Sequence, residues 1–445
     1  MRKIYSAIII ILAMVFLLYA GSSLYNIAAI SSYKCHDCNV LLITIDALRA
    51  DHVSAYGYER NITPNIDSVA KDGILFRNAM GQASWTIPSL TSMLLSKNSP
   101  NSSIIAGYGV EGIPSIADAL DSSLSTVAVI AYQSLHFLSR RFENFTQINV
   151  TESDVTSENV TSLAAGWIEG NKNKQFFLWV HYFDPHYTYY PPEGYRDLYP
   201  DYSGQLNRSR PYNISELREL IPNLTEDDIK YIVSLYDGEI KYTDLYIGVL
   251  LKKIKELGLD NKTVIIITAD HGEEFLERGR IGHAETLYDE IIHVPLIIRN
   301  PRSPVAGVEI GNLVRLIDVG PTILDILGIK APESFEGESI YKIVNGNIAV
   351  ESFGRKYPVI AGDEDIFSLR TQAYKFVQHG DIQKGSELYN LSADPLERKN
   401  ISAAYSDAVL GFRKAVAKYL TADIAERPDL SEEKKAVLRS LGYLI

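Results

Sequence analysis

Short apolar runs rich in Val and Ile recur along the chain, at residues 39–45, 125–131, 175–180, 264–267 and 294–298. Their length and β-branched content predict buried strands rather than helices. Segments with a helical spacing of apolar positions lie between them, at 65–73, from about residue 86, and at 225–258. Strands that alternate with helices in this order predict an α/β fold, with a mostly parallel sheet flanked by helices on both faces.

Polar side chains follow several of these strands, at the edge where an α/β sheet places its ligands. The residues at these positions are carboxylates and imidazoles: Asp46, His181, His186, Asp270, His271 and, further on, His283. Taken singly, each is also compatible with a polar strand end that only caps the next element. Their repetition after separate strands favours a functional site.

A hydroxyl group lies near this edge at the start of a predicted helix. Pro88 suggests that the helix begins near Thr86, because proline is tolerated in a first helical turn. The Thr86 hydroxyl is then either an ordinary N-cap or a group placed where free backbone N–H groups favour an anion. From this segment alone the cap is the simpler interpretation.

The combination of side chains suits a divalent cation. The two carboxylates Asp46 and Asp270 and an imidazole such as His271 are ligands for ions of hard to borderline character. A hydroxyl bound to such an ion has a lowered pKa and acts as a nucleophile. We expect one ion (Mg, Mn, Ca or Zn), because His293 and Asp184 are the only spare ligand candidates.

The N-terminus predicts a membrane anchor. Arg2 and Lys3 precede a nearly uncharged apolar stretch from residue 4 to about residue 30, long enough to span a bilayer. The positive charges before it keep the N-terminus in the cytoplasm and place the remainder outside. A cleaved signal peptide is the alternative, with small residues at 20–23 as its cleavage site. Both interpretations predict an extracytoplasmic body.

Two further features agree with an exported glycoprotein. Sequons of the form Asn-x-Ser/Thr occur at Asn61, Asn101, Asn144, Asn149, Asn159, Asn207, Asn213, Asn223, Asn261, Asn390 and Asn400. The only two cysteines, Cys35 and Cys38, are expected to form a structural disulfide outside the cell. The net charge of −12 argues against a nucleic-acid partner.

The chain divides into three predicted parts. Residues 1–31 form the anchor, 32–344 the catalytic domain, and 345–445 a smaller C-terminal α+β unit with strands at 358–361, 366–378 and 386–391 and helices after residue 403. The tyrosine-rich stretch 187–192 is either a wall of the binding site or an ordinary aromatic surface loop. Residues 193–222 are polar and expected to be irregular.

The ordered set of motifs resembles the sulfatase family of the alkaline phosphatase superfamily over almost the whole body. The segments that carry the resemblance are ITIDALRAD (43–51), SWTIPSLTSML (84–94), VHYFDPH (180–186), YDGEIKYTD (236–244), ADHGE (269–273), IIHVPLIIR (291–299), ELYNLSADPLERKNI (387–401) and LRSLGYL (438–444). The resemblance implies an alkaline-phosphatase-like fold and a metal-dependent hydrolase or transferase of sulfate or phosphate esters.

The resemblance also implies roles for the residues that match the motifs. Four of them are implied as metal ligands, namely Asp46, Asp270, His271 and Thr86, and Thr86 also stands at the nucleophile position. His181 or His186 is implied to contact the anionic oxygens of the substrate. His283 matches a basic group that assists the leaving group or the transferring anion.

The positions at which this chain departs from the family pattern indicate which reaction it is expected to catalyse. Sulfatases carry Cys or Ser in C/S-x-P-x-R, which is oxidised to formylglycine, whereas this chain has Thr86 and Leu90 around the retained Pro88. Threonine cannot form formylglycine, and Ala47 replaces a carboxylate ligand. A threonine nucleophile resembles the phosphoglycerol and phosphoethanolamine transferases, which modify surface glycans or lipids. A catalytically inactive surface protein that binds anions or glycans is the alternative of another class.

Overall fold

The computed structural model describes residues 33–98, 110, 112–120, 124–148, 156–344, 359–363, 366–380 and 385–420. The predicted membrane anchor, residues 1–31, lies outside these ranges. Within the described ranges, no helix is both long enough and apolar enough to cross a membrane. The predicted domain boundary at residue 344 falls at the edge of a segment outside the described ranges, so it stays a prediction.

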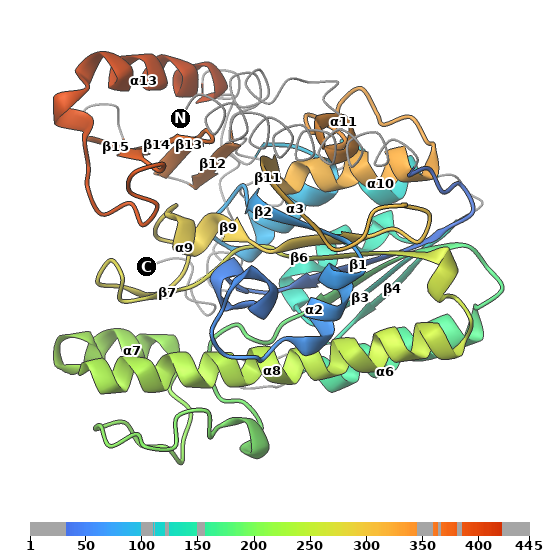
Figure 1. The fold of residues 1–445 in the computed structure, drawn as a ribbon, viewed down its shortest axis with the longest axis horizontal. Helices are drawn as coiled ribbons and strands as arrows, with labels where there is room; N and C mark the ends of the chain where they lie inside the picture. Colours follow the sequence, from blue (N-terminus) through green and yellow to red (C-terminus); the bar gives the residue numbers. More distant parts are fainter. Residues whose placement is uncertain are drawn as a thin grey trace, which may run out of the picture.

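A mixed, mostly parallel sheet of nine strands forms the centre of the described molecule (Figure 1). Its strand order is β11 (Val308–Arg315), β2 (Ile74–Met80), β10 (Leu296–Arg299), β6 (Thr263–Ala269), β1 (Asn39–Ile45), β5 (Phe176–Tyr182), β3 (Ser125–Ile130) and β4 (Asn144–Gln147), and the short β9 (His293–Val294) pairs with β2. β10 runs antiparallel to both of its neighbours, whereas β1 pairs in parallel with β5 and β6. The predicted α/β architecture is confirmed.

Helices cover both faces of this sheet (Figure 1). The layer below it in that view contains α2 (Pro64–Lys71), α6 (Ser157–Gly170) and the 31-residue α8 (Glu226–Glu256). The opposite layer contains α3 (Thr86–Leu95), the short α5 (Ile116–Ala119) and α10 (Val319–Leu327), and α11 (Ile340–Val344) packs on α10. The sheet is therefore buried on both sides.

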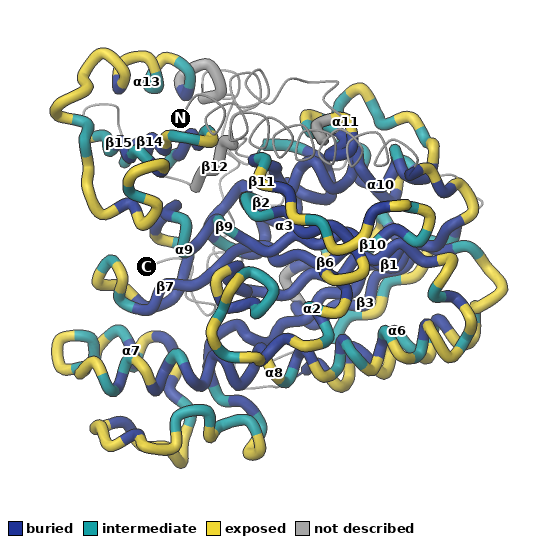
Figure 2. Tube along the Cα trace, viewed as in Figure 1, coloured by how far each residue is buried: buried dark blue, intermediate teal, exposed yellow. Residues whose placement is uncertain are grey.

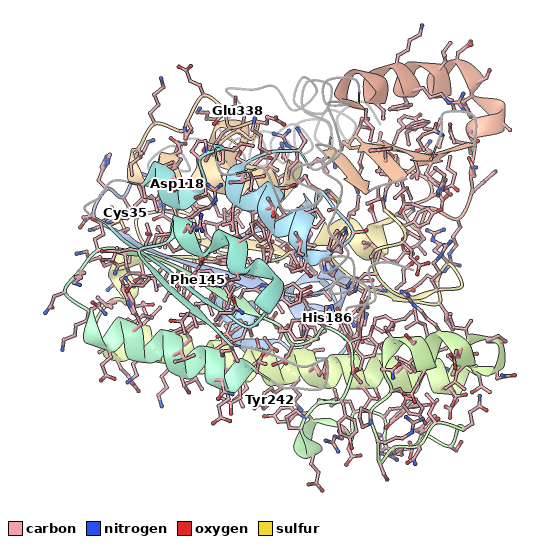
Figure 3. All side chains as sticks on the ribbon, turned by 180° about the vertical axis from the view of Figure 1, so that it is seen from behind. Cys35, Asp118, Phe145, His186, Tyr242 and Glu338 are labelled. Carbon is pink, nitrogen blue, oxygen red and sulfur yellow. A yellow bond between two sulfur atoms is a disulfide. The ribbon has the colours of Figure 1, made fainter. Side chains whose placement is uncertain are left out.

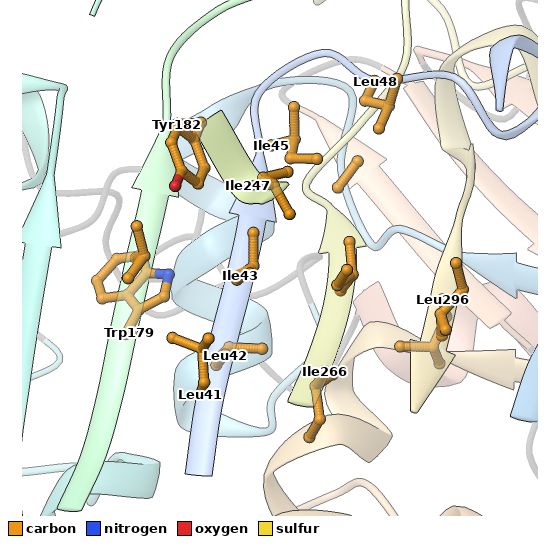
Figure 4. Packing of buried hydrophobic residues seen from close by; sticks show 14 of the residues in the cluster. Leu41, Leu42, Ile43, Ile45, Leu48, Trp179, Tyr182, Ile247, Ile266 and Leu296 are labelled. Atoms are coloured by element: carbon orange, nitrogen blue, oxygen red, sulfur yellow. The ribbon is translucent and has the colours of Figure 1, made fainter. Parts of the chain in front are cut away.

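This burial explains the continuous apolar runs in the sequence. All seven residues of β1, of β5 and of β6 are buried, so these strands need apolar side chains on both faces. Figure 2 shows the buried residues concentrated in the sheet and on the helix faces that cover it. Leu42 of β1, Trp179 of β5 and Ile266 of β6 pack in this core (Figure 4).

The region 193–222 differs from its predicted irregular structure, because it contains the helix α7 (Ile214–Leu220). Asn213 caps this helix: its side chain accepts a hydrogen bond from the backbone of Glu216, whose carboxylate accepts one from Asn213 N. This reciprocal capping box was readable in the sequence as Asn-x-x-Glu before an apolar run.

The C-terminal part forms a second, four-stranded antiparallel sheet covered by α13 (Ser406–Leu420). Its strands are β12 (Val359–Asp363), β13 (Ile366–Arg370), β14 (Tyr374–His379) and β15 (Ser386–Asn390). The predicted single strand at 366–378 is wrong, since a turn at 371–373 divides it into β13 and β14. Leu369, Phe376 and Leu388 of the sheet pack against Val409 and Val416 of α13.

A buried ionic cluster joins this sheet to the large domain. Lys375 of β14 is fully buried, and its Nζ lies 2.9 Å from Asp289 Oδ1 and 3.0 Å from Glu397 Oε1. Arg370 Nη2 lies 3.0 Å from Asp289 Oδ2. Because Asp289 begins the short helix α9 (Asp289–Ile292), these ion pairs fix the C-terminal sheet against the segment that follows His283.

The predicted disulfide between Cys35 and Cys38 is present. It lies beside α10, where Cys35 N donates a hydrogen bond to Ile326 O at 2.7 Å. The sequon asparagines within the described ranges are exposed, except for Asn390, which is half-buried. Both findings agree with the sequence-based expectation of surface sequons and a structural disulfide.

Candidate active site

The candidate site lies at the carboxyl ends of three adjacent strands, β5, β1 and β6. The parallel register pairs Thr44 with His181 on one side of β1 and Ile45 with Ala269 on the other. Asp46 and Asp270 therefore leave the sheet side by side, directly after paired residues. The structure confirms that the strand ends predicted from the sequence meet at one edge.

The Thr86 hydroxyl reaches this edge from the opposite helix layer. Helix α3 begins at Thr86, but its N-cap is Trp85, and no side chain caps the helix. The Thr86 Oγ1 atom instead lies 3.3 Å from Asp46 Oδ2 and 3.3 Å from His271 Nε2. The simpler interpretation of Thr86 as an N-cap is therefore wrong, because its hydroxyl faces the ligand candidates.

Asp270 and His271 are held by backbone groups. Asp270 Oδ1 accepts hydrogen bonds from Ala47 N at 3.1 Å and from His271 N at 2.8 Å. The His271 Nδ1 atom lies 2.9 Å from Gly272 O, which directs its Nε2 atom toward Asp46. A side chain at Gly272 would place its Cβ 2.2 Å from Glu290 O, so the turn requires glycine.

The spacing of these atoms fits metal ligation better than direct hydrogen bonding. His271 Nε2 lies 3.4 Å from Asp46 Oδ1 and 3.5 Å from Asp270 Oδ2, beyond the usual range of about 2.7–3.2 Å for a hydrogen bond. Ligands that each lie about 2.1 Å from one ion are about 3–4 Å apart. Asp270 Oδ2 is buried without a hydrogen-bond partner, which a bound cation would satisfy.

The electrostatics of the site also favour a cation. Burial and the neighbouring Asp270 carboxylate raise the pKa of Asp46 well above its usual range. Burial would lower the pKa of His271, but the charges of Asp270 and Asp46 outweigh it and raise that pKa. Two fully buried carboxylates side by side are stable as anions only beside a positive charge. The residues present therefore fit a divalent ion.

A second part of the site lies on the hairpin of β7 (Glu274–Phe275) and β8 (Ile281–Gly282). His283 follows β8, and its ring centre lies 4.3 Å from that of His271 and 4.9 Å from that of His186. The ring of Tyr187 stacks on His283 at 4.8 Å. The tyrosine-rich loop thus forms a wall of the site, and His186 lies on the same loop (Figure 3).

Glu273 is a member of the site to which the sequence analysis assigned no role. Its Oε1 atom lies 2.9 Å from His283 Nδ1, and both side chains are fully buried. Burial raises the pKa of Glu273 to about 8 and lowers the pKa of His283. The sequence could have indicated a role for Glu273, because this residue directly follows the Asp-His-Gly motif.

The two spare ligand candidates lie outside the site. Asp184 accepts hydrogen bonds from Thr156 N and Ser157 N and so caps the start of α6. His293 Nε2 lies 2.8 Å from Arg77 O. Both side chains have structural partners, and the number of ions stays a prediction.

The fold and the site together describe an α/β protein in which a buried group of side chains could hold a divalent ion beside a hydroxyl at a helix start. Residues 38–329 match the Sulfatase family, and residues 283–422 match the C-terminal region of N-sulphoglucosamine sulphohydrolase. The chain therefore belongs to the sulfatase family of sulfuric ester hydrolases.

Individual members of this family have low sequence identity to the chain. Arylsulfatase K of Bos taurus is 30% identical over 206 residues, which cover 44% of this chain and 38% of the bovine protein. The N-acetylglucosamine-6-O-sulfatase of Bacteroides thetaiotaomicron is 23% identical over 465 residues, covering 82% of each chain. The chain thus matches less than half the length of the bovine relative.

Solved structures share the fold. The phosphonate monoester hydrolase of Agrobacterium radiobacter aligns with a TM-score of 0.67 and 20% identity, covering 86% of this chain and 95% of that one. The structure of BT4656 in complex with its substrate D-glucosamine-2-N,6-O-disulfate aligns with a TM-score of 0.67 and 19% identity, covering 87% and 97%. These likenesses establish the alkaline-phosphatase-like architecture.

Proposed function

We propose that this protein is a metal-dependent hydrolase that cleaves sulfate esters of glycans, with the Thr86 hydroxyl as its nucleophile. Membership of the sulfatase family supports the reaction class. The glycan substrate is supported by the names of the N-acetylglucosamine-6-O-sulfatase and of the glucosamine-disulfate complex.

The observation that carries the proposal is the position of the Thr86 hydroxyl. The Thr86 side chain is fully buried, and its Oγ1 atom lies 3.3 Å from both Asp46 Oδ2 and His271 Nε2. Asp46, Asp270 and His271 would hold a divalent ion, which would lower the pKa of the hydroxyl and neutralise ester oxygens. This position supports the assignment of Thr86 as the nucleophile.

The reaction follows from the side chains around Thr86. The Thr86 hydroxyl gives up its proton to solvent, its oxygen attacks the sulfur of the ester, and the bond from sulfur to the leaving oxygen breaks. His283 takes up a proton from solvent and gives it to that oxygen, for which its lowered pKa makes the protonated ring a stronger acid, and His186 contacts the remaining sulfate oxygens. Water then attacks the threonine sulfate ester, which releases inorganic sulfate and restores the hydroxyl.

A phosphodiesterase or phosphotransferase is the second candidate, favoured by one observation. Threonine at position 86 cannot become formylglycine, so its ester intermediate must be cleaved by direct attack of water or an acceptor alcohol at sulfur or phosphorus. Threonine esters of phosphate are the intermediates of the phosphoglycerol and phosphoethanolamine transferases that this segment resembles. The substrate would then be a glycan or a lipid head group. An extracytoplasmic, membrane-anchored location would suit either activity.

The deciding experiment compares an aryl sulfate with an aryl phosphodiester. The full-length protein, purified in mild detergent, is assayed with Mg²⁺, Mn²⁺, Ca²⁺ or Zn²⁺, alongside Thr86→Ala and Thr86→Ser. We expect sulfate turnover that is lost in Thr86→Ala and partly kept in Thr86→Ser, because serine retains a hydroxyl.

Three other outcomes would each change the conclusion. Turnover of the phosphodiester alone, again lost in Thr86→Ala, would establish the second candidate. Turnover that survives Thr86→Ala would refute the role of Thr86. Metal binding without turnover of either ester would identify a binding protein of another class.

A further inference from the structure

His181 lies in the same cluster as the ligand candidates, and its Nδ1 atom has a defined partner. Trp179 Nε1 donates a hydrogen bond to Thr44 Oγ1 at 2.9 Å, and His181 Nδ1 lies 2.9 Å from the same oxygen. The Val180 carbonyl oxygen, 3.5 Å from Thr44 Oγ1, can only accept a proton. When the hydroxyl proton points to that carbonyl, Thr44 Oγ1 accepts one hydrogen bond from Trp179 Nε1 and one from His181 Nδ1.

This arrangement favours the tautomer of His181 that carries its proton on Nδ1. With the proton on Nδ1, the Nε2 atom carries a lone pair. The opposite tautomer would place a proton on Nε2, where it is buried without a hydrogen-bond partner and is therefore disfavoured. Asp46 Oδ2 lies 3.5 Å from Nε2, too far to accept that proton well.

The unprotonated Nε2 atom of His181 lies among the same side chains as the carboxylates of Asp46 and Asp270. One ligand atom each from Asp46, His181 and Asp270 lies within 4.8 Å of the other two, and all three side chains are fully buried. Neither His181 Nε2 nor Asp270 Oδ2 has a hydrogen-bond partner. A shared cation satisfies both atoms at once.

We propose that His181 is a ligand of the divalent ion rather than a contact of the substrate oxygens, and that it supplies the ligand that Ala47 lacks. This inference rests on the proposed metal dependence. With His181 and His271 the site has two imidazole nitrogens beside two carboxylates. Ca²⁺ prefers six to eight oxygen ligands, whereas imidazole suits transition metals such as Zn²⁺. The site therefore selects Zn²⁺ over Ca²⁺.

The test measures metal binding directly and does not depend on turnover. The full-length protein is stripped of metal, equilibrated with Zn²⁺, Mn²⁺ or Ca²⁺ by dialysis, and analysed for bound metal beside His181→Gln and His181→Asp. Loss of a partner that only orients a ligand weakens metal binding about 10–100-fold. We expect His181→Gln to weaken Zn²⁺ binding at least about 100-fold, and His181→Asp to restore binding with a shift toward Ca²⁺.

Two controls separate ligation from folding. His186→Gln changes another buried histidine of the site, whose Nδ1 atom lies 2.6 Å from Tyr187 O, and should leave metal affinity unchanged. The visible spectrum of bound Co²⁺ should change in His181→Gln and not in His186→Gln. Wild-type Zn²⁺ affinity in His181→Gln, with turnover lost, would overturn this inference and leave the proposed function intact. Absence of metal binding in the wild type would refute both.

Discussion

The hydrogen bond between Glu273 and His283 predicts a specific kinetic defect. If His283 protonates the leaving oxygen, Glu273 acts as a positioning residue that holds the imidazole through its Nδ1 atom at 2.9 Å. Glu273→Ala removes this bond and leaves a buried ring nitrogen unpaired, which costs about 1–3 kcal/mol. At 1.36 kcal/mol per tenfold change, kcat falls about 5- to 150-fold.

The dependence on the leaving group distinguishes positioning from general damage. Aryl esters of weakly acidic phenols need the proton from His283, so the full loss should appear with them. Nitrophenol esters release a nitrophenolate, which is a stable anion, so their kcat should change little. Glu273→Gln keeps an oxygen that accepts from Nδ1 and should restore most of the activity.

The control is Glu274→Ala, which truncates the neighbouring carboxyl. Glu274 is equally buried, and its backbone pairs with Gly282 on the other strand of the hairpin. This variant should reduce kcat equally for all leaving groups, if at all. The same uniform reduction in Glu273→Ala would refute the positioning role, and so would no reduction.

Two further predictions concern stability. Lys375→Met leaves the buried Glu397 and the half-buried Asp289 without their shared ammonium and should lower the free energy of unfolding by about 3–5 kcal/mol in urea titrations. The exposed Lys399→Met should change it by less than about 0.5 kcal/mol, and equal effects of the two substitutions would contradict the argument. Burial would raise the pKa of Glu387, but hydrogen bonds led by that from His379 lower it from 4.5 to about 2. Its stabilising contribution, roughly 1–2 kcal/mol once solvent screening is allowed for, is present above pH 4.5 and lost as pH falls toward 2. Glu387→Gln should therefore flatten this acid-induced loss of stability, and an unchanged pH profile would refute the assignment.

The large sheet was predictable because its central strands are buried on both faces, which leaves an unbroken apolar run in the sequence. Smaller elements carry weaker signals. The turn at 371–373 reads Thr-Gln-Ala and contains neither glycine nor proline, so nothing in the sequence separates β13 from β14. Helix α7 was missed for another reason, since its capping Asn213 was read only as a sequon.

In the candidate site too, the sequence indicated which residues take part more clearly than what each residue does. Asp46, Asp270 and His271 could be proposed as ligands from the sequence, because they follow the ends of two apolar strands. The role of His181 depends on how far β5 extends and on its register with β1, which no local pattern encodes. The sequence analysis ended this strand at residue 180, which placed His181 in the substrate-facing loop with His186.

In the structure β5 continues to Tyr182, and His181 pairs with Thr44 inside the sheet. That register brings the Thr44 hydroxyl to the Nδ1 atom of His181 and the carboxylate of Asp46 close to its Nε2 atom. A shift of one residue would turn the His181 side chain to the other face of the sheet, because strand side chains alternate. The proposed ligand set, and with it the proposed preference for a metal, therefore depends on a strand register that only the folded structure supplies.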